Sequence, residues 1–128
     1  MDIAATLLAV DNEAKYVEIA RRHLAHDRRV TFHVEDGASF LRGLGSSRFD
    51  LIFADTWPGK FDHLQDALEL LNPGGLYVID DLLPQPNWSD DHAPKIPLLI
   101  NHLETDPRLV LCKLSWSSGI IIATRRAT

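Results

Sequence analysis

Short apolar runs alternate with amphipathic helical patterns along the whole chain, and this alternation constrains the fold most strongly. Strands that alternate with helices form a mostly parallel sheet with right-handed crossovers and helices on both faces. A short Ser-Ser-Gly turn joins the last two apolar runs, so that pair is expected to be antiparallel. We therefore predict one doubly wound α/β domain over residues 1–128. The predicted strands are 7–11, 30–35, 50–55, 76–80, 109–114 and 120–125, and the helical patterns cover 13–26, 37–44, 64–71 and 96–103.

Composition and charge exclude several classes of protein. The 128 residues carry a formal net charge of −5, which argues against nucleic acid or an anionic membrane as the main partner. The single cysteine, Cys112, excludes an internal disulfide, and its place in a predicted buried strand makes it an expected inert core residue. No apolar run reaches the roughly 20 residues that span a bilayer. The first residues contain Asp2 and no basic region, so we expect no secretory signal and a reduced, cytoplasmic setting.

Acidic residues end the first four predicted strands. They are Asp11, Asp36 after Glu35, Asp55, and the pair Asp80 and Asp81. In an open α/β sheet, ligands bind outside the carboxyl ends of the strands. Each acid alone is equally well explained as the cap of a following helix, because aspartate is favoured at that position. Four such strands together favour a shared site for a divalent cation, ligand hydroxyls or a cationic ligand.

The pair of Asp80 and Asp81 requires compensation. Two adjacent carboxylates at the end of a buried strand repel each other, and such a cost is commonly tolerated at a working site. A metal ion, a lysine or a hydrogen-bond network would supply the compensation. Lys60 and Lys95 are the candidate lysines, and the sequence does not choose between them.

Aromatic residues and a proline-rich stretch lie near these acids in the sequence. Asp55 is followed by Thr-Trp-Pro-Gly, which is typical of a pocket wall or of a surface turn with a half-buried Trp57. Residues 84–94 contain three prolines, which exclude a continuous helix or central strand there. A loop of this length is usually functional or disordered. Trp88 and His92 within it are candidate pocket residues.

The order of these segments resembles a known family. The runs LLAVDNEAKYVEIARRHL, RVTFHVEDGASFL, FDLIFADTWPGKF and LELLNPGGLYVIDDLLP, and the ending KLSWSSGIIIATRR, resemble class I S-adenosylmethionine-dependent methyltransferases. The closest group is the O-methyltransferases similar to catechol and caffeoyl-CoA enzymes. The resemblance implies a Rossmann-like sheet with a C-terminal antiparallel hairpin. It also implies methyl transfer from S-adenosylmethionine to an oxygen of a small molecule.

The resemblance implies roles for individual residues. Asp11 matches the acid that binds the ribose hydroxyls of the cofactor, and Asp36, with Gly37 and Ala38, matches the segment near the adenine. Asp55 matches the acid near the methyl group and the substrate. The implied catalytic residues are Asp55, Asp80 and Lys60, although Lys60 stands two positions later than the family pattern expects. The implied substrate contacts are Trp57, Trp88 and His92.

A divalent cation such as Mg²⁺ is implied by the metal-dependent members of the family. Their ligands match Asp55, Asp80 and Asp81 in this chain. Asp81 replaces the asparagine of the family pattern, so the resemblance leaves the metal open.

The start of the chain departs from the family. No strand with a glycine-rich cofactor loop precedes Ile3, and the missing strand is central in the family sheet. We therefore expect the strands ending at Asp11 and Asp55 to pair with each other, to accept a strand from another chain, or to leave a gap. An N-terminally truncated reading frame would explain this departure. Cofactor binding and methyl transfer are expected to be impaired in this chain alone, and a homodimer would complete the sheet.

Two other functions stay open at this stage. One is a non-catalytic methyltransferase-like fragment that dimerises or binds a partner. The other is a phospho-acceptor receiver domain, which the segments LLAVDNE and DLIFADTWPG also resemble; however, receivers need Thr or Ser where this chain has Asp80. A dinucleotide-dependent oxidoreductase is weaker still, because no GxGxxG motif is present.

Overall fold

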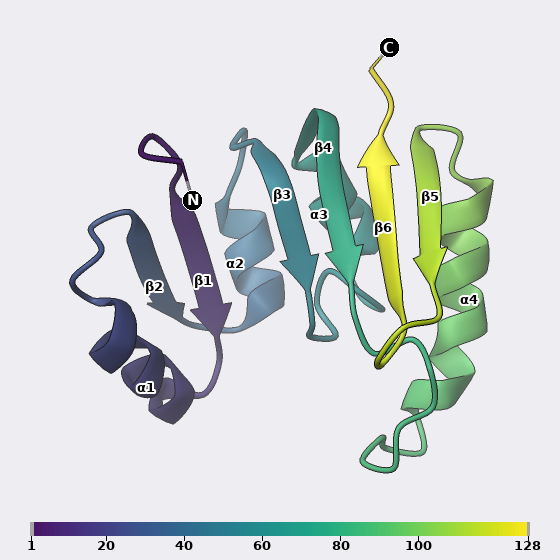
Figure 1. The fold of residues 1–128 in the computed structure, drawn as a ribbon, viewed down its shortest axis with the longest axis horizontal. Coiled ribbons are helices and arrows are strands. Elements are labelled where there is room, and N and C mark those ends of the chain that lie inside the picture. Colours follow the sequence, from purple (N-terminus) through teal and green to yellow (C-terminus); the bar gives the residue numbers. More distant parts are fainter. Residues whose placement is uncertain (1, 128) are drawn as a thin grey trace. The chain divides into compact units, whose positions relative to one another are not determined.

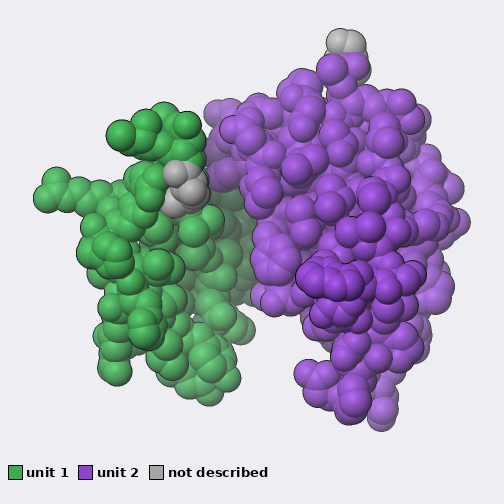
Figure 2. Space-filling view, viewed as in Figure 1, with its two compact units in different colours: residues 1–44 green, residues 45–128 purple. Residues whose placement is uncertain are grey.

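The computed structural model describes residues 2–127 of the chain. They form two compact units, which divide between Leu44 and Gly45 and are coloured separately in Figure 2. The predicted single domain stays a prediction.

The first unit is a pair of parallel strands with two helices. Its strands pair in register from Leu7 opposite Val30 to Asp11 opposite Val34. Its first helix packs against both strands and buries Val17. The elements lie close to the predicted positions, and they are β1 (Leu7–Asp11), α1 (Ala14–Leu24), β2 (Val30–Val34) and α2 (Gly37–Gly43).

The second unit is a four-stranded sheet in the order β3-β4-β6-β5 (Figure 1). The β3–β4 pair is parallel, whereas β6 is antiparallel to both β4 and β5. The predicted C-terminal antiparallel hairpin is therefore confirmed. The elements are β3 (Phe49–Ala54), α3 (Leu64–Glu69), β4 (Leu71–Ile79), α4 (His92–Thr105), β5 (Leu109–Leu114) and β6 (Ile120–Arg125).

The α/β fold with parallel strands and a C-terminal hairpin agrees with the sequence prediction. Within the described residues, β1 pairs with β2 in the first unit and β3 pairs with β4 in the second. The three arrangements expected for β1 and β3 stay predictions. No helix within these residues is long and apolar enough to cross a membrane.

The predicted boundaries are wrong in α3, β4 and α4. The helix α3 ends at Glu69, although the predicted helix extends to Leu71. The strand β4 begins at Leu71, five residues earlier than predicted, because Leu71 already pairs with Phe49 before the Asn-Pro-Gly-Gly segment bulges out of the ladder. The helix α4 begins at His92, inside the stretch predicted as a loop. Pro94 is tolerated there because the first turn of a helix leaves its N–H groups without intrahelical partners.

The prediction for Cys112 is wrong as well. Its residue is exposed, because β5 lies at the edge of the sheet and every second side chain faces away from the covered side.

The apolar core of the second unit lies between its sheet and its two helices. The helix α3 packs against β4, and α4 packs against β5. The buried helical side chains follow the predicted helical spacing closely. They are Leu64, Ala67 and Leu68 on α3 and Ile96, Leu99 and Leu103 on α4.

Candidate functional site

Lys60 is the central residue of the candidate site. Its side chain is 2% exposed, and it is the one fully buried charged residue among residues 2–127. The Nζ atom donates a hydrogen bond of 2.6 Å to the backbone oxygen of Asp80 and lies 3.5 Å from that of Asp81. The turn after β3 thus inserts an ammonium group at the carboxyl end of β4.

A tight turn over residues 57–62 fixes the position of Lys60. The backbone oxygen of Trp57 accepts hydrogen bonds from the N–H groups of Lys60 at 3.0 Å, Phe61 at 2.9 Å and Asp62 at 3.1 Å. Gly59 is buried within the turn at a φ of +87°, a conformation that favours glycine. The turn formed by the Trp-Pro-Gly-Lys sequence therefore directs the side chain of Lys60 into the interior.

The carboxylate of Asp80 is held by the opposite hairpin. It accepts hydrogen bonds from the backbone N–H of Asp81 at 2.7 Å and from the hydroxyl of Ser118 in the β5–β6 turn. The backbone N–H of Leu83 also donates to Ser118, at 2.7 Å. Sequence reasoning missed Ser118, since its only signal was a turn 38 residues further along the chain.

Gly119 allows the two segments to lie this close together. It has a φ of +83°, and a Cβ atom there would lie 2.7 Å from the backbone nitrogen of Leu83. Any side chain at this position would therefore separate the hairpin turn from the segment after β4.

The pKa values of Asp55 and Lys60 are both shifted. Burial raises the pKa of the Asp55 carboxyl, the negative charges of Asp81 and Asp80 raise it further, and the Lys60 ammonium opposes them. Burial lowers the pKa of Lys60, and the three carboxylates oppose that shift. The predicted compensation of the acidic pair is therefore supplied by Lys60, while the Lys95 ammonium lies 4.9 Å from the centre of the Trp57 ring.

An aromatic cluster of Trp57, Phe61, Trp88 and His92 lies beside the acids. The rings of Trp88 and His92 stack at 4.2 Å, and Phe61 meets the edge of His92 at 5.0 Å and of Trp57 at 5.8 Å. His92 Nε2 lies 3.2 Å from the backbone oxygen of Asp81, which can accept a hydrogen bond from it. The Nε1 atom of Trp88 is buried without a hydrogen-bond partner. The structure thus brings the three predicted substrate contacts into one cluster.

The described residues do not fit the predicted metal site. Among residues 2–127, no group of three or more His, Cys, Asp or Glu residues is arranged to hold a metal ion. The Asp80 carboxylate faces Ser118 and the N–H of Asp81, and the Lys60 ammonium already lies at the backbone oxygens of both acids.

The predicted cofactor acids of the first unit bind local backbone groups. Asp11 accepts a hydrogen bond from the N–H of Glu13 at 2.7 Å, and Asp36 caps α2 by accepting from the N–H of Ser39 at 2.9 Å. This contact lowers the pKa of Asp36. Gly37 and Ala38 form the first residues of α2. A carboxylate offers about four acceptor positions, so each acid can still accept hydrogen bonds from ligand hydroxyl or amino groups.

A cavity of about 420 Å³ lies between the start of α3 and α4. Lys60, Phe61 and Lys95 of the site contribute to its wall, together with His63 and His102. None of the acids of the site lines it.

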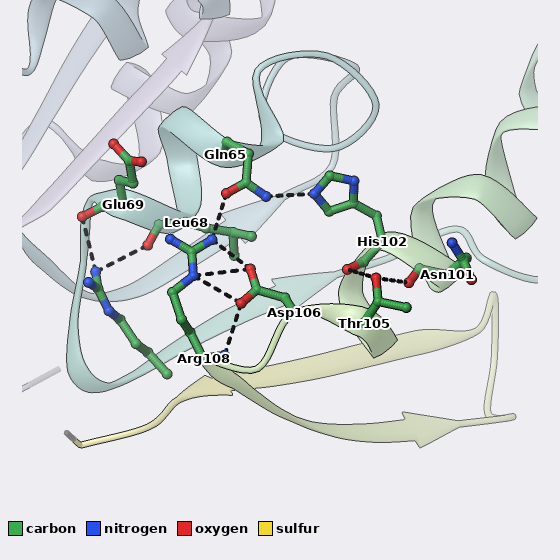
Figure 3. A network of polar contacts seen from close by, with 9 residues as sticks. Gln65, Leu68, Glu69, Asn101, His102, Thr105, Asp106 and Arg108 are labelled. Atoms are coloured by element: carbon green, nitrogen blue, oxygen red, sulfur yellow. Dashed lines mark hydrogen bonds and ion pairs between the residues drawn. The ribbon is translucent and has the colours of Figure 1, made fainter.

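A polar network that includes two residues of the cavity wall, Gln65 and His102, joins α3 to the end of α4 (Figure 3). Gln65 donates to His102 at 2.6 Å and accepts from Arg108 at 2.6 Å, and Arg108 in turn binds Asp106 through two of its nitrogens. This network fixes the helices that form the wall of the cavity.

One family model matches nearly the whole chain. The family model for O-methyltransferases matches residues 4–126, and the chain belongs to this family. Comparison with curated proteins gives no match.

Solved structures with the same fold include several methyltransferases. A putative O-methyltransferase from Klebsiella pneumoniae is 26% identical with a TM-score of 0.84, and 99% of this chain covers 64% of it. The O-methyltransferase TomG from Streptomyces achromogenes, solved in complex with SAM, is 20% identical with a TM-score of 0.83, and 99% of this chain covers 65% of it. The O-methyltransferase from Bacillus cereus, solved in complex with SAH, is 20% identical with a TM-score of 0.81, and 94% of this chain covers 63% of it. This chain therefore spans less than two thirds of the length of these proteins.

Proposed function

We propose that this chain takes part in methyl transfer from S-adenosylmethionine to an oxygen atom of a small molecule. The observation that carries the proposal is the buried ammonium of Lys60 among Asp55, Asp80 and Asp81, beside an aromatic cluster, in a chain of the O-methyltransferase family. Two of the solved proteins with this fold were obtained with SAM or SAH, which supports the choice of cofactor.

The first unit supplies the proposed cofactor contacts. Asp11 would accept hydrogen bonds from ribose hydroxyls, and Asp36 with Gly37 and Ala38 would bind near the adenine. The backbone contact of each carboxylate leaves further acceptor positions. These positions can accept hydrogen bonds from ribose hydroxyls or from the adenine amino group. The bound cofactor supplies a methyl group on a sulfonium, an electrophile that needs orientation more than activation.

The second unit supplies the proposed acceptor chemistry. With the cofactor bound, the acceptor oxygen would take the methyl group from the sulfonium, whose carbon–sulfur bond would break, and the carboxylate of Asp55 would accept the proton of that oxygen. The raised pKa of Asp55 suits a group that must take this proton. The Lys60 ammonium attracts the negative charge that develops on the acceptor oxygen, and Asp80 positions this ammonium through its backbone oxygen.

The aromatic cluster favours a flat, aromatic acceptor. Trp57, Trp88 and His92 present ring surfaces next to the acids, and stacked or edge-on contacts to such rings add to the burial of apolar surface. A reduced, cytoplasmic location and a homodimer that completes the sheet stay predictions.

The sheet order favours this proposal over a phospho-acceptor receiver. The strand β6 lies between β4 and β5 and runs antiparallel to both, whereas a doubly wound receiver sheet needs parallel strands. No observation in the described residues favours a purely structural fragment.

Two variants test the proposal in different steps. Asp55→Asn removes the proton acceptor. In a longer form of the chain that binds S-adenosylmethionine, we therefore expect methyl transfer to a panel of hydroxylated aromatic compounds to fall by about 100-fold while the cofactor still binds. Asp11→Asn removes a ribose contact, so we expect weaker cofactor binding by calorimetry. In the wild type, methyl transfer is expected to rise with pH through the raised pKa of Asp55, because its carboxylate form takes the proton.

Asp50→Asn is the matched control, because Asp50 lies at the amino end of the same strand and binds Asn72. It is expected to leave both binding and rate unchanged. Absence of cofactor binding by the wild-type chain and by a longer form of it would overturn the proposed function.

A further inference from the structure

The Lys60 ammonium lies at the carboxyl edge of β4, beside the acids that match the metal ligands of the family. We propose that this ammonium is the resident cation of the acidic edge and that the edge needs no divalent ion. The proposal concerns the same site as the proposed function but does not depend on it, because its tests measure metal binding and unfolding.

The first argument is the burial of the ammonium group. A buried ammonium is costly unless opposite charges and hydrogen-bond acceptors surround it. Lys60 is 2% exposed, and its Nζ atom donates at 2.6 Å to the backbone oxygen of Asp80, which is the length of a strong charge-assisted hydrogen bond. Asp55, Asp80 and Asp81 are the carboxylates that act on it electrostatically. The acids and the lysine therefore compensate each other.

The second argument is that other donors already engage one oxygen of each acid, namely Oδ1 of Asp80 and the backbone oxygen of Asp81. Ser118 and the N–H of Asp81 bind the carboxylate of Asp80, and His92 Nε2 lies 3.2 Å from the backbone oxygen of Asp81. Mg²⁺ demands near-ideal octahedral oxygen coordination. A divalent ion that used these two oxygens would have to displace these contacts, and the Lys60 ammonium would repel it from the remaining carboxylate oxygens.

The third argument is that Lys60 is held in place. Three backbone N–H groups of its turn converge on the oxygen of Trp57, and its Nζ lies 5.1 Å from the centre of the Phe61 ring. An ammonium near an aromatic ring gains a cation–π interaction. The position of the charge is thus set by the fold, unlike that of a lysine on the surface.

The first test is a metal titration of the wild-type chain. Thermal unfolding is followed with millimolar Mg²⁺, Mn²⁺ or a chelator, and Tb³⁺ luminescence sensitised by Trp57 and Trp88 reports a bound ion directly. We expect no shift of the unfolding midpoint and no saturable Tb³⁺ signal from this edge. A midpoint that rises with Mg²⁺, or a Tb³⁺ signal that Asp81→Asn abolishes, overturns the proposal.

The second test replaces the ammonium. Lys60→Met keeps an apolar stem and removes the charge, so the acids lose their cation. We expect this variant to become sensitive to metal, with a higher unfolding midpoint in Mg²⁺ and a saturable Tb³⁺ signal. Lys60→Arg keeps a positive charge and is expected to stay insensitive. A folded Lys60→Met variant whose unfolding midpoint and Tb³⁺ signal do not respond to metal would contradict the proposal. If this variant does not fold, the metal titration of the wild-type chain tests the proposal.

Discussion

The two units differ sharply in how much they bury. Among the described residues up to Leu44, Val17 is the one fully buried apolar side chain, whereas the second unit buries both of its helices against a four-stranded sheet. Apolar residues of the first unit such as Tyr16 and Ile19 are more than half exposed. Burial of apolar area is the main stabilising term in folding, so the second unit carries most of the stability of the chain.

The acids at the strand ends differ in the same way. Asp11 and Asp36 bind backbone N–H groups two and three residues further along the chain, as turn and cap residues do. Asp80 instead contacts residues 20 and 38 positions away, namely Lys60 and Ser118. The comparison separates acids that are held by neighbouring backbone groups from an acid that distant turns of the same unit hold in place.

The largest expected effect is on hydrogen exchange. Local opening is cheap where few apolar contacts must break, so amides of β1 and β2 should exchange at least ~100-fold faster than those of β4 and β6. Mass spectrometry of the deuterated chain measures this ratio. S-adenosylmethionine should slow exchange mainly in the first unit if Asp11 and Asp36 bind it. Equal protection of the amides in both units would contradict the expected difference in local stability.

The next effect is on global stability. Leu103 is 1% exposed on α4, and Leu103→Ala is expected to lower the free energy of unfolding by about 3 kcal/mol, because it leaves a cavity in the core. Leu98 lies on the same helix and is 71% exposed, so Leu98→Ala should change the free energy of unfolding by less than about 0.5 kcal/mol. Urea unfolding compares the two variants, and similar losses would show that α4 does not pack as described.

A smaller effect is expected from the two aspartate–arginine turns, one in each unit. Arg108 binds Asp106, whose side chain is 6% exposed, and continues to Gln65. Arg108→Ala is expected to cost about 1 kcal/mol, because it leaves a buried carboxylate without its main donor. Arg29 binds Asp27 in the same way before β2. Because this turn is more exposed, Arg29→Ala should lower the free energy of unfolding by less than Arg108→Ala does.

The same turn predicts a dependence of stability on pH. The hydrogen bond from Arg108 lowers the pKa of Asp106, so the folded state holds this carboxylate charged more strongly than the unfolded state does. The resulting stabilisation is complete above the ordinary aspartate pKa and is lost as the pH falls through the lowered pKa. Unfolding curves at neutral and acidic pH should therefore differ less for Arg108→Ala than for the wild type.

Local patterns predicted most of the fold. The positions of β1, β2, β5 and β6 depend on short apolar runs and turns, which neighbouring residues determine. The start of β4 could not be predicted, because Leu71 joins the strand only through its partner Phe49 on β3. The start of α4 at His92 was hidden by Pro94, a proline that the first turn of a helix accepts.

The sequence predicted the acids of the candidate site but not the residues that contact them. The repulsion between Asp80 and Asp81 indicated a compensating group, but only the tertiary turn after β3 selects Lys60 over Lys95. Ser118 gave no signal at all, because a serine in a hairpin turn is ordinary until the hairpin meets the end of β4.

Gly119 has a consequence at the level of the gene. It carries no chemistry, yet any of the amino acids that one nucleotide change in a glycine codon produces would place a Cβ atom against Leu83. Gly43 has open space around the same position and an ordinary φ, so its codon can vary freely. A library of single-codon variants should therefore lose nearly every change at position 119, and the hairpin turn, rather than the acids alone, would emerge as a mutational constraint on the acidic edge.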